Sequence, residues 1–122
     1  PGGFPGDTRS CFTTEGRTKA ENDMFRWTAR LLHWRQGNEV ITKGKQTQFI
    51  PQNGVYVVAR SYNGKNVMTV INGTSKAATM KAERYAEIIG DAQEATNILT
   101  GHKINISKDV KLAPRGVMVL EF

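Results

Sequence analysis

The apolar positions of the chain change their spacing at Gly37, from a helical period to an alternating one. Before this glycine, the segment KAENDMFRWTARLLHWRQ repeats apolar residues at i, i+3 and i+4 spacing, which predicts one amphipathic helix over residues 19–36. Thr18 and Glu21 have the spacing of a capping box at the start of this helix. Gly37 stands where a left-handed residue would end it. The apolar stripe is too wide for a helix that is largely exposed to solvent, so we expect another part of the protein or a partner to cover it.

After Gly37 the strongest signal is a β-hairpin. The segments VYVVARSY and KNVMTVIN flank Asn63-Gly64, a typical two-residue hairpin turn. The turn predicts three cross-strand pairs: Tyr62 with Lys65, Ala59 with Met68, and Val57 with Val70. The other face of the hairpin is also apolar, with Tyr56, Val58, Val67 and Ile71. We therefore expect a central hairpin that is covered on both faces, with Tyr56 buried.

The rest of the chain predicts short strands between turns. The segments QTQFI, ATNILTG, HKINIS, VKLA and GVMVLEF have strand-like composition, whereas AATMKAERYAEIIGD fits either a strand or a helical turn. About eight strands at this spacing indicate an antiparallel β-sandwich or barrel. The fold class expected is therefore mainly β, with one long helix before the strands.

Composition and charge narrow the function only slightly. The 122 residues carry a net charge of +6, but the 17 lysines and arginines are spread along the chain. Scattered surface cations are favoured over a nucleic-acid site, because no basic cluster with interleaved aromatic residues occurs. No apolar run approaches the length of a membrane span, so no membrane partner is expected. A single cysteine, Cys11, rules out an internal disulfide framework.

Residues with catalytic potential are few. His33, His102 and Cys11 have no partners at metal-ligand or nucleophile spacing, and Gly44-Lys45 lacks the preceding glycines of a phosphate loop. We therefore expect no catalytic residue, no metal and no cofactor. Asn72-Gly73-Thr74 and Asn105-Ile106-Ser107 match the glycosylation pattern, which arises often by chance. Asp7 lies in the glycine-rich segment PGGFPGD, where a ligand could approach the backbone, but its chemistry alone favours a turn-forming aspartate.

Several segments together resemble one family. They are PGGFPGD, CFTTEGRTKAENDMFRWTARLLHWR, GVYVVARSYNGKNVMTVING, ILTG and LAPRGVMVLEF, in this order and over essentially the whole chain. They are similar to the C-terminal end of cyclomaltodextrinase and neopullulanase-type enzymes, which belong to the α-amylase family of glycoside hydrolases. The resemblance implies that residues 1–37 are the last loop and final helix of a (β/α)₈ catalytic barrel. Residues 38–122 would then be the C-terminal antiparallel β-sandwich.

The resemblance also implies that catalysis and this chain's role belong to different parts of the enzyme. The parent enzyme would hydrolyse α-glucosidic bonds in cyclodextrins, pullulan or maltooligosaccharides with carboxylates on earlier barrel strands, and none of these maps onto this chain. The chain alone is expected to be inactive, to cap the barrel, and to come from a bacterial periplasm or cytoplasm. The helix would contact the missing barrel through five side chains: Met24, Phe25, Trp27, Leu31 and Trp34. Phe4 and Asp7 would border the carbohydrate cleft.

The alternative is a free-standing β-sandwich module that binds carbohydrate or protein. Such a module must bury the apolar stripe of the helix within itself, whereas a piece of a larger enzyme would expose much of the stripe or hide it by dimerisation. The rings available for stacking on sugar would be Tyr56, Tyr62 and Tyr85.

Overall fold

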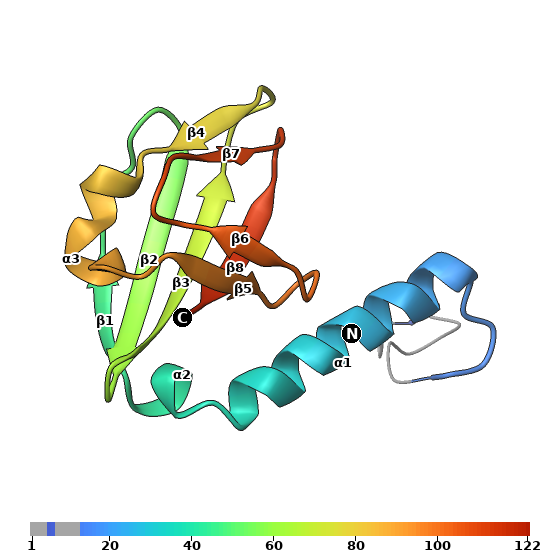
Figure 1. The fold of residues 1–122 in the computed structure, drawn as a ribbon. Helices are drawn as coiled ribbons and strands as arrows, with labels where there is room; N and C mark the ends of the chain where they lie inside the picture. Colours follow the sequence, from blue (N-terminus) through green and yellow to red (C-terminus); the bar gives the residue numbers. More distant parts are fainter. Residues whose placement is uncertain (1–4, 7–12) are drawn as a thin grey trace. The chain divides into compact units, whose positions relative to one another are not determined.

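The computed structural model describes residues 5–6 and 13–122. The chain divides into two compact units, one ending at His33 and the other running from Trp34 to Phe122. In the first unit, helix α1 begins at Lys19, and its bounds are Lys19–Gln36, as the apolar period predicts (Figure 1). The capping box is confirmed: the Glu21 N–H donates to Thr18 Oγ1 at 3.2 Å, and the Thr18 N–H donates to Glu21 Oε2 at 3.3 Å.

The end of α1 differs from the prediction. Gly37 is not among the described glycines with a positive φ, so the left-handed cap is wrong. Instead, the Asn38 N–H donates to the Arg35 carbonyl at 3.2 Å, and the Asn38 side chain accepts from the Val40 N–H at 3.0 Å. Asn38 is thus the N-cap of a second short helix, α2 (Glu39–Lys43), which the alternating pattern did not indicate.

The second unit is built from antiparallel strands. The described residues form eight: β1 (Lys45–Gln48), β2 (Val55–Tyr62), β3 (Lys65–Asn72), β4 (Ala78–Met80), β5 (Glu94–Asn97), β6 (Lys103–Asn105), β7 (Val110–Leu112) and β8 (Val117–Glu121). Six of them make one sheet in the order β1-β2-β3-β8-β5-β6, and β4 pairs with β7. The segment that fitted either strand or helix contains both, since β4 leads into η1 (Ala82–Tyr85) and α3 (Ala86–Ile89). Figure 1 shows α3 and the β4–β7 pair beside the long β2–β3 hairpin.

The β2–β3 hairpin has the predicted register. Tyr62 pairs with Lys65, Ala59 with Met68, and Val57 with Val70. At the turn, Asn63 has φ 50° and Gly64 has φ 77°, the left-handed pair that this type of turn requires. The next strand in space is β8, which pairs with β3 so that Met68 lies opposite Leu120.

The main core lies on one face of this sheet. It contains strand residues and residues from the segments that cover them: Val57, Ala59, Met68, Val70, Leu120, Met80, Tyr85, Ile89, Ile106 and Leu112. The Phe49 and Tyr85 rings meet edge to face, with centroids 4.9 Å apart. A smaller cluster on the opposite face joins Val40, Val67 and Val119 with the half-buried Trp34 and Ile41.

The opposite face is covered only in part. Val67 is 3% exposed, but Tyr56 is 49% and Ile71 is 39% exposed. The prediction that Tyr56 is buried is therefore wrong. Alternation correctly placed Tyr56 with Val67 on one face, but α2 and Trp34 cover only the end of the face where Val67 lies.

Candidate functional site

The residues predicted to border a carbohydrate cleft, Phe4 and Asp7, lie outside the described part of the chain, as does Cys11. Their roles therefore remain predictions from the sequence. The described residues that the sequence singled out are those of helix α1, the three tyrosines and the two histidines.

Helix α1 presents its apolar residues to the surface. No residue of α1 is buried, and Met24 is 62%, Phe25 53% and Trp27 40% exposed. Leu31 and Trp34 are half-buried, and Trp34 packs into the cluster around Val67. Complete burial of a large apolar side chain contributes about 1.5–3 kcal/mol of stability. A partner that covers these exposed side chains would therefore stabilise the helix further. The described residues do not supply the cover that the stripe needs.

Charged groups at the start of α1 order the helix rather than form a reactive site. The Arg17 guanidinium lies 4.2 Å from the centroid of the Phe25 ring, and Lys19 pairs with Asp23 at 2.6 Å one helical turn later. These are exposed interactions, each of which contributes a few tenths of a kcal/mol to about 1 kcal/mol. Arg17 lies over one side of the Phe25 ring, and Phe25 nevertheless stays 53% exposed.

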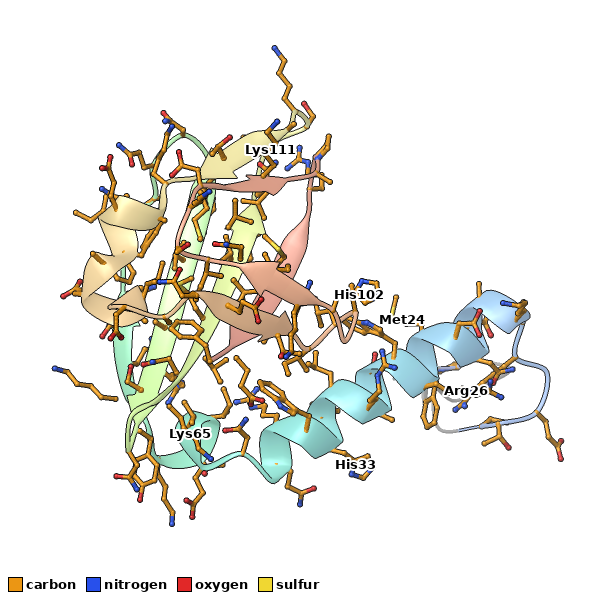
Figure 2. The ribbon with its side chains drawn as sticks, in the orientation of Figure 1. Met24, Arg26, His33, Lys65, His102 and Lys111 are labelled. Atoms are coloured by element: carbon orange, nitrogen blue, oxygen red, sulfur yellow. The ribbon has the colours of Figure 1, made fainter. Side chains whose placement is uncertain are left out.

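The histidines offer no metal site. Figure 2 shows His33 on α1 and His102 at the turn between β5 and β6, and both side chains are exposed. Within residues 5–6 and 13–122, no group of three or more His, Cys, Asp or Glu side chains could hold a metal ion. No described helix is both long and apolar enough to cross a membrane.

Of the three tyrosines, only Tyr56 has a largely accessible ring. Tyr85 is 2% exposed and packs on Phe49, and Tyr62 is half-buried in the Val67 cluster. The Tyr56 ring lies against Gly73, because a Cβ built on Gly73 would stand 2.9 Å from Tyr56 Cε2. The tyrosines therefore do not form an exposed aromatic pair on which a sugar could be held.

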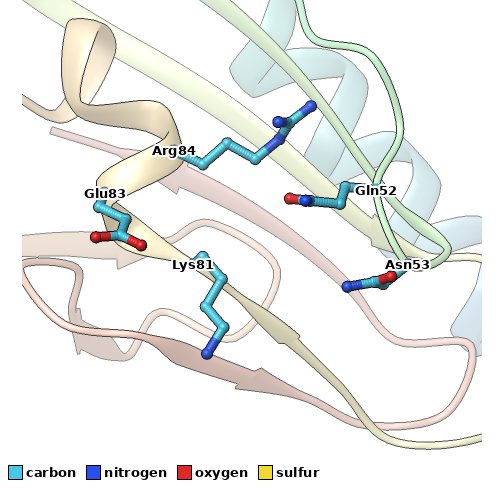
Figure 3. Close-up of a pocket in the computed structure, with 5 residues that line it drawn as sticks. All are labelled: Gln52, Asn53, Lys81, Glu83 and Arg84. Carbon is cyan, nitrogen blue, oxygen red and sulfur yellow. The ribbon is translucent and has the colours of Figure 1, made fainter.

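A polar pocket of about 590 Å³ lies between the 51–54 turn and the 81–84 segment. Figure 3 shows the residues that line it: Gln52, Asn53, Lys81, Glu83 and Arg84. The cations already have partners, because Lys81 pairs with Asp109 at 3.1 Å and Arg84 donates to the Ile50 carbonyl at 2.6 Å. Both cations thus join the 81–84 segment to neighbouring parts of the chain, and the single carboxylate of the pocket, Glu83, does not provide an acid–base pair.

The pKa of the Asp109 carboxyl group lies below its ordinary value. The hydrogen bond from Lys81 lowers the pKa of Asp109 most, followed by the hydrogen bond from the Ala82 N–H at 3.2 Å. Because Asp109 is bonded to the backbone at the start of η1, its role is to join β4 and η1 to the loop before β7. The lowered pKa thus marks a structural ion pair rather than a general acid.

Comparisons with known proteins agree with this description. A family model described as the cyclo-malto-dextrinase C-terminal domain matches residues 46–121. A structure of AmyP in complex with maltose is 18% identical with a TM-score of 0.70, and the match covers 87% of this chain and 22% of that one. An α-amylase from Geobacillus thermoleovorans complexed with acarbose is 17% identical with a TM-score of 0.68, covering 88% and 24% of the two chains.

A third structure is the noncanonic maltogenic α-amylase AmyB from Thermotoga neapolitana. It is 15% identical with a TM-score of 0.65, and the match covers 89% of this chain and 27% of that one. The chain thus spans about a quarter of the length of these three solved structures. At these identities the likeness concerns the fold, which is a mainly β C-terminal domain with one helix before it.

Proposed function

The chain belongs to the cyclo-malto-dextrinase C-terminal domain family, and from this premise we propose that it is the non-catalytic end of a larger glycoside hydrolase. The larger enzyme cleaves α-glucosidic bonds in cyclodextrins, pullulan or maltooligosaccharides, and this chain caps and stabilises its catalytic barrel. Residues 1–37 contribute the last loop and helix of the barrel, and residues 38–122 form the C-terminal β domain.

The observation that carries this proposal is the exposed stripe of α1. A free-standing module would bury Met24, Phe25 and Trp27 within itself, yet all three are at least 40% exposed. A helix with such a stripe needs an apolar partner, and the final helix of a barrel has one in the barrel sheet. In the same proposal, Leu31 and Trp34 complete the set of α1 side chains that contact the barrel.

Two measurements test the proposal. The first is the mass of the native polypeptide in its source cells, detected with an antibody against the β domain. A chain several times heavier than 13.5 kDa is expected, whereas a native product of about 13.5 kDa would leave no room for a catalytic barrel and would contradict the proposal.

The second measurement is hydrolysis by the isolated 122-residue chain. No release of reducing sugar from maltooligosaccharides is expected, because the catalytic carboxylates lie elsewhere; activity that survives purification would contradict the proposal.

We extend the proposal to Phe4 and Asp7, near the start of the sequence. Phe4 stacks on a glucose ring at the border of the cleft, and Asp7 accepts hydrogen bonds from sugar hydroxyls. In the complete enzyme, Phe4→Ala and Asp7→Ala should raise KM for maltooligosaccharides while leaving the unfolding temperature unchanged. Unchanged KM values in both variants would limit this loop to a structural role.

A further inference from the structure

We infer that the β domain carries a second apolar contact for the same catalytic domain, on the open part of its six-stranded sheet. This inference rests on the proposed function, because the occupant is the domain that precedes this chain in the larger enzyme. The contact consists of a single line of side chains, here called the sheet row: Ile50, Tyr56, Ile71 and Val117.

The sheet row is a set of direct neighbours on adjacent strands. Tyr56 lies opposite Ile71 in the β2–β3 pair, and Ile71 lies opposite Val117 in the β3–β8 pair. The Phe49 N–H donates to the Val57 carbonyl at 3.2 Å, which continues the β1–β2 register and places Ile50 beside Tyr56. Phe49 packs into the main core, so by alternation Ile50 lies on the same face as Tyr56.

Exposure separates the sheet row from the rest of the β domain. Among the described residues, the exposed large hydrophobic side chains fall into two sets, one on α1 and one in the sheet row. In the row, Ile50 is 81%, Tyr56 49%, Ile71 39% and Val117 46% exposed. Single exposed hydrophobic residues are ordinary, but a continuous line of them is typical of an interaction surface.

Hydrogen bonds fix the backbone next to Tyr56, so this part of the row can bind a partner without a change in backbone conformation. The Gly73 N–H donates to the Gly54 carbonyl at 2.8 Å, and Arg115 donates to the Gly73 carbonyl. The Tyr56 ring rests on Gly73, where any side chain would displace it. A rigid aromatic side chain on a fixed backbone loses little conformational entropy on binding, which favours its use in an interface.

The row is continuous with a surface that the preceding polypeptide already covers. Val67 and Val119 are buried on this face by Trp34, Val40 and Ile41, all of which come immediately before the sheet in sequence. In the proposed enzyme the preceding domain is joined by the chain to this covering segment, which favours it as the occupant of the remaining part of the face.

Other occupants fit the row less well. A second copy of this chain would bring together two chains that each carry a net charge of +6, which opposes association. A carbohydrate needs hydrogen-bonding groups around an aromatic ring, whereas Tyr56 has the aliphatic side chains of Ile50 and Ile71 as neighbours. An apolar surface of a folded domain matches the row in chemistry.

Thiol labelling tests this inference in the longest polypeptide that contains this chain and in the 122-residue chain. In a Cys11→Ser background, single cysteines are placed in the row (Ile71→Cys or Val117→Cys) and at a matched exposed strand position, Thr79→Cys, on β4. Circular dichroism first verifies that each variant is folded. The row cysteines should react at least about tenfold more slowly in the long polypeptide than in the 122-residue chain, while Thr79→Cys reacts equally in both.

Each contrary result has a distinct meaning. Equal reaction of the row cysteines in both chains would overturn the inference and leave the proposed function intact. Protection in the 122-residue chain that grows with protein concentration would assign the row to a second copy and also overturn it. A Met24→Cys thiol on α1 that reacts equally in both chains, or a long polypeptide without a catalytic domain, would instead refute the proposed function on which the inference rests.

Discussion

Asn72 at the end of β3 provides the sharpest test of how the β domain is held together. The side chain is 1% exposed, and its Nδ2 donates to the Lys76 carbonyl at 2.7 Å and to the Ala113 carbonyl at 3.0 Å. Its Oδ1 accepts from the Thr74 N–H at 3.0 Å and from Thr74 Oγ1 at 2.7 Å. One carboxamide therefore joins β3, the turn after it and the loop before β8.

We predict that Asn72→Asp strongly lowers the free energy of unfolding. The substitution keeps the size of the side chain and the two contacts to Thr74, but it replaces both N–H donors by a carboxylate oxygen. Two hydrogen bonds are lost at about 1 kcal/mol each, and the Lys76 and Ala113 carbonyls are left facing a negative charge at about 1–3 kcal/mol. The expected loss is therefore about 3–5 kcal/mol, a large fraction of the 5–15 kcal/mol that stabilises a typical domain.

The chain contains a matched control at Asn105. Its Oδ1 accepts from the Ser107 N–H at 2.9 Å and from Ser107 Oγ at 2.7 Å, the same pattern that Asn72 makes with Thr74. Asn105 is exposed, however, so its amide hydrogens face water. Asn105→Asp should therefore cost less than about 1 kcal/mol, since surface substitutions of this kind change stability little.

The assay is urea unfolding followed by circular dichroism, at neutral pH and at about pH 4. The cost of Asn72→Asp should shrink as pH falls, because a protonated carboxyl group can donate to one of the two carbonyls. Similar losses for Asn72→Asp and Asn105→Asp at neutral pH would refute the reasoning, because the two substitutions differ only in the buried donor contacts.

Two further predictions concern local structure. Because the hydrogen bond from Lys81 lowers the pKa of Asp109 below its ordinary value of 3.8, the folded state gains stability above that value and loses the gain as pH falls through the acid range. Urea midpoints of wild type and Asp109→Asn should therefore differ at neutral pH and converge in acid; a constant difference would contradict the pairing. Gly44→Ala should destabilise the domain by about 2 kcal/mol or more, because its Cβ would stand 2.1 Å from the Val40 carbonyl oxygen. Gly101→Ala, which has φ 76° but open space, should cost only about 1 kcal/mol, and an equal loss in thermal unfolding would argue against the steric reason.

The parts of the fold that the sequence predicted correctly are those determined by neighbouring residues. Asn63-Gly64 can form a tight turn with both residues left-handed, and that turn fixes the register of both strands. Thr18 and Glu21 satisfy N–H groups at the start of α1, so that end of the helix was also predictable. Neither signal depends on distant parts of the chain.

The errors arose where two local interpretations competed. Glycine is the residue that most often forms a left-handed helix C-cap, which is why Gly37 was predicted to be one. However, the next residue, Asn38, already caps helix α2, so α1 ends without a left-handed C-cap. The Asn38-Glu39 pair is itself a helix-start signal, because the asparagine caps the helix and the carboxylate favours its positive end. Giving that signal more weight than the glycine would have revealed α2.

Burial on the second face of the sheet could not be predicted from alternation, because alternation tells which residues share a face and not what lies over them. The lengths of the elements explain the outcome. Helix α2 has five residues and is about 7.5 Å long, whereas β2 has eight residues and extends about 26 Å. Even with Trp34 beside it, α2 covers only the end of the face at Val67, so Tyr56 and Ile71 are left open. The second face has apolar side chains at both ends, with Val67 at one end and Tyr56 and Ile71 at the other. The described residues cover only the Val67 end, which leaves the other end open to a second body. For that reason the apolar pattern that misled the prediction for Tyr56 also supports an interdomain contact there.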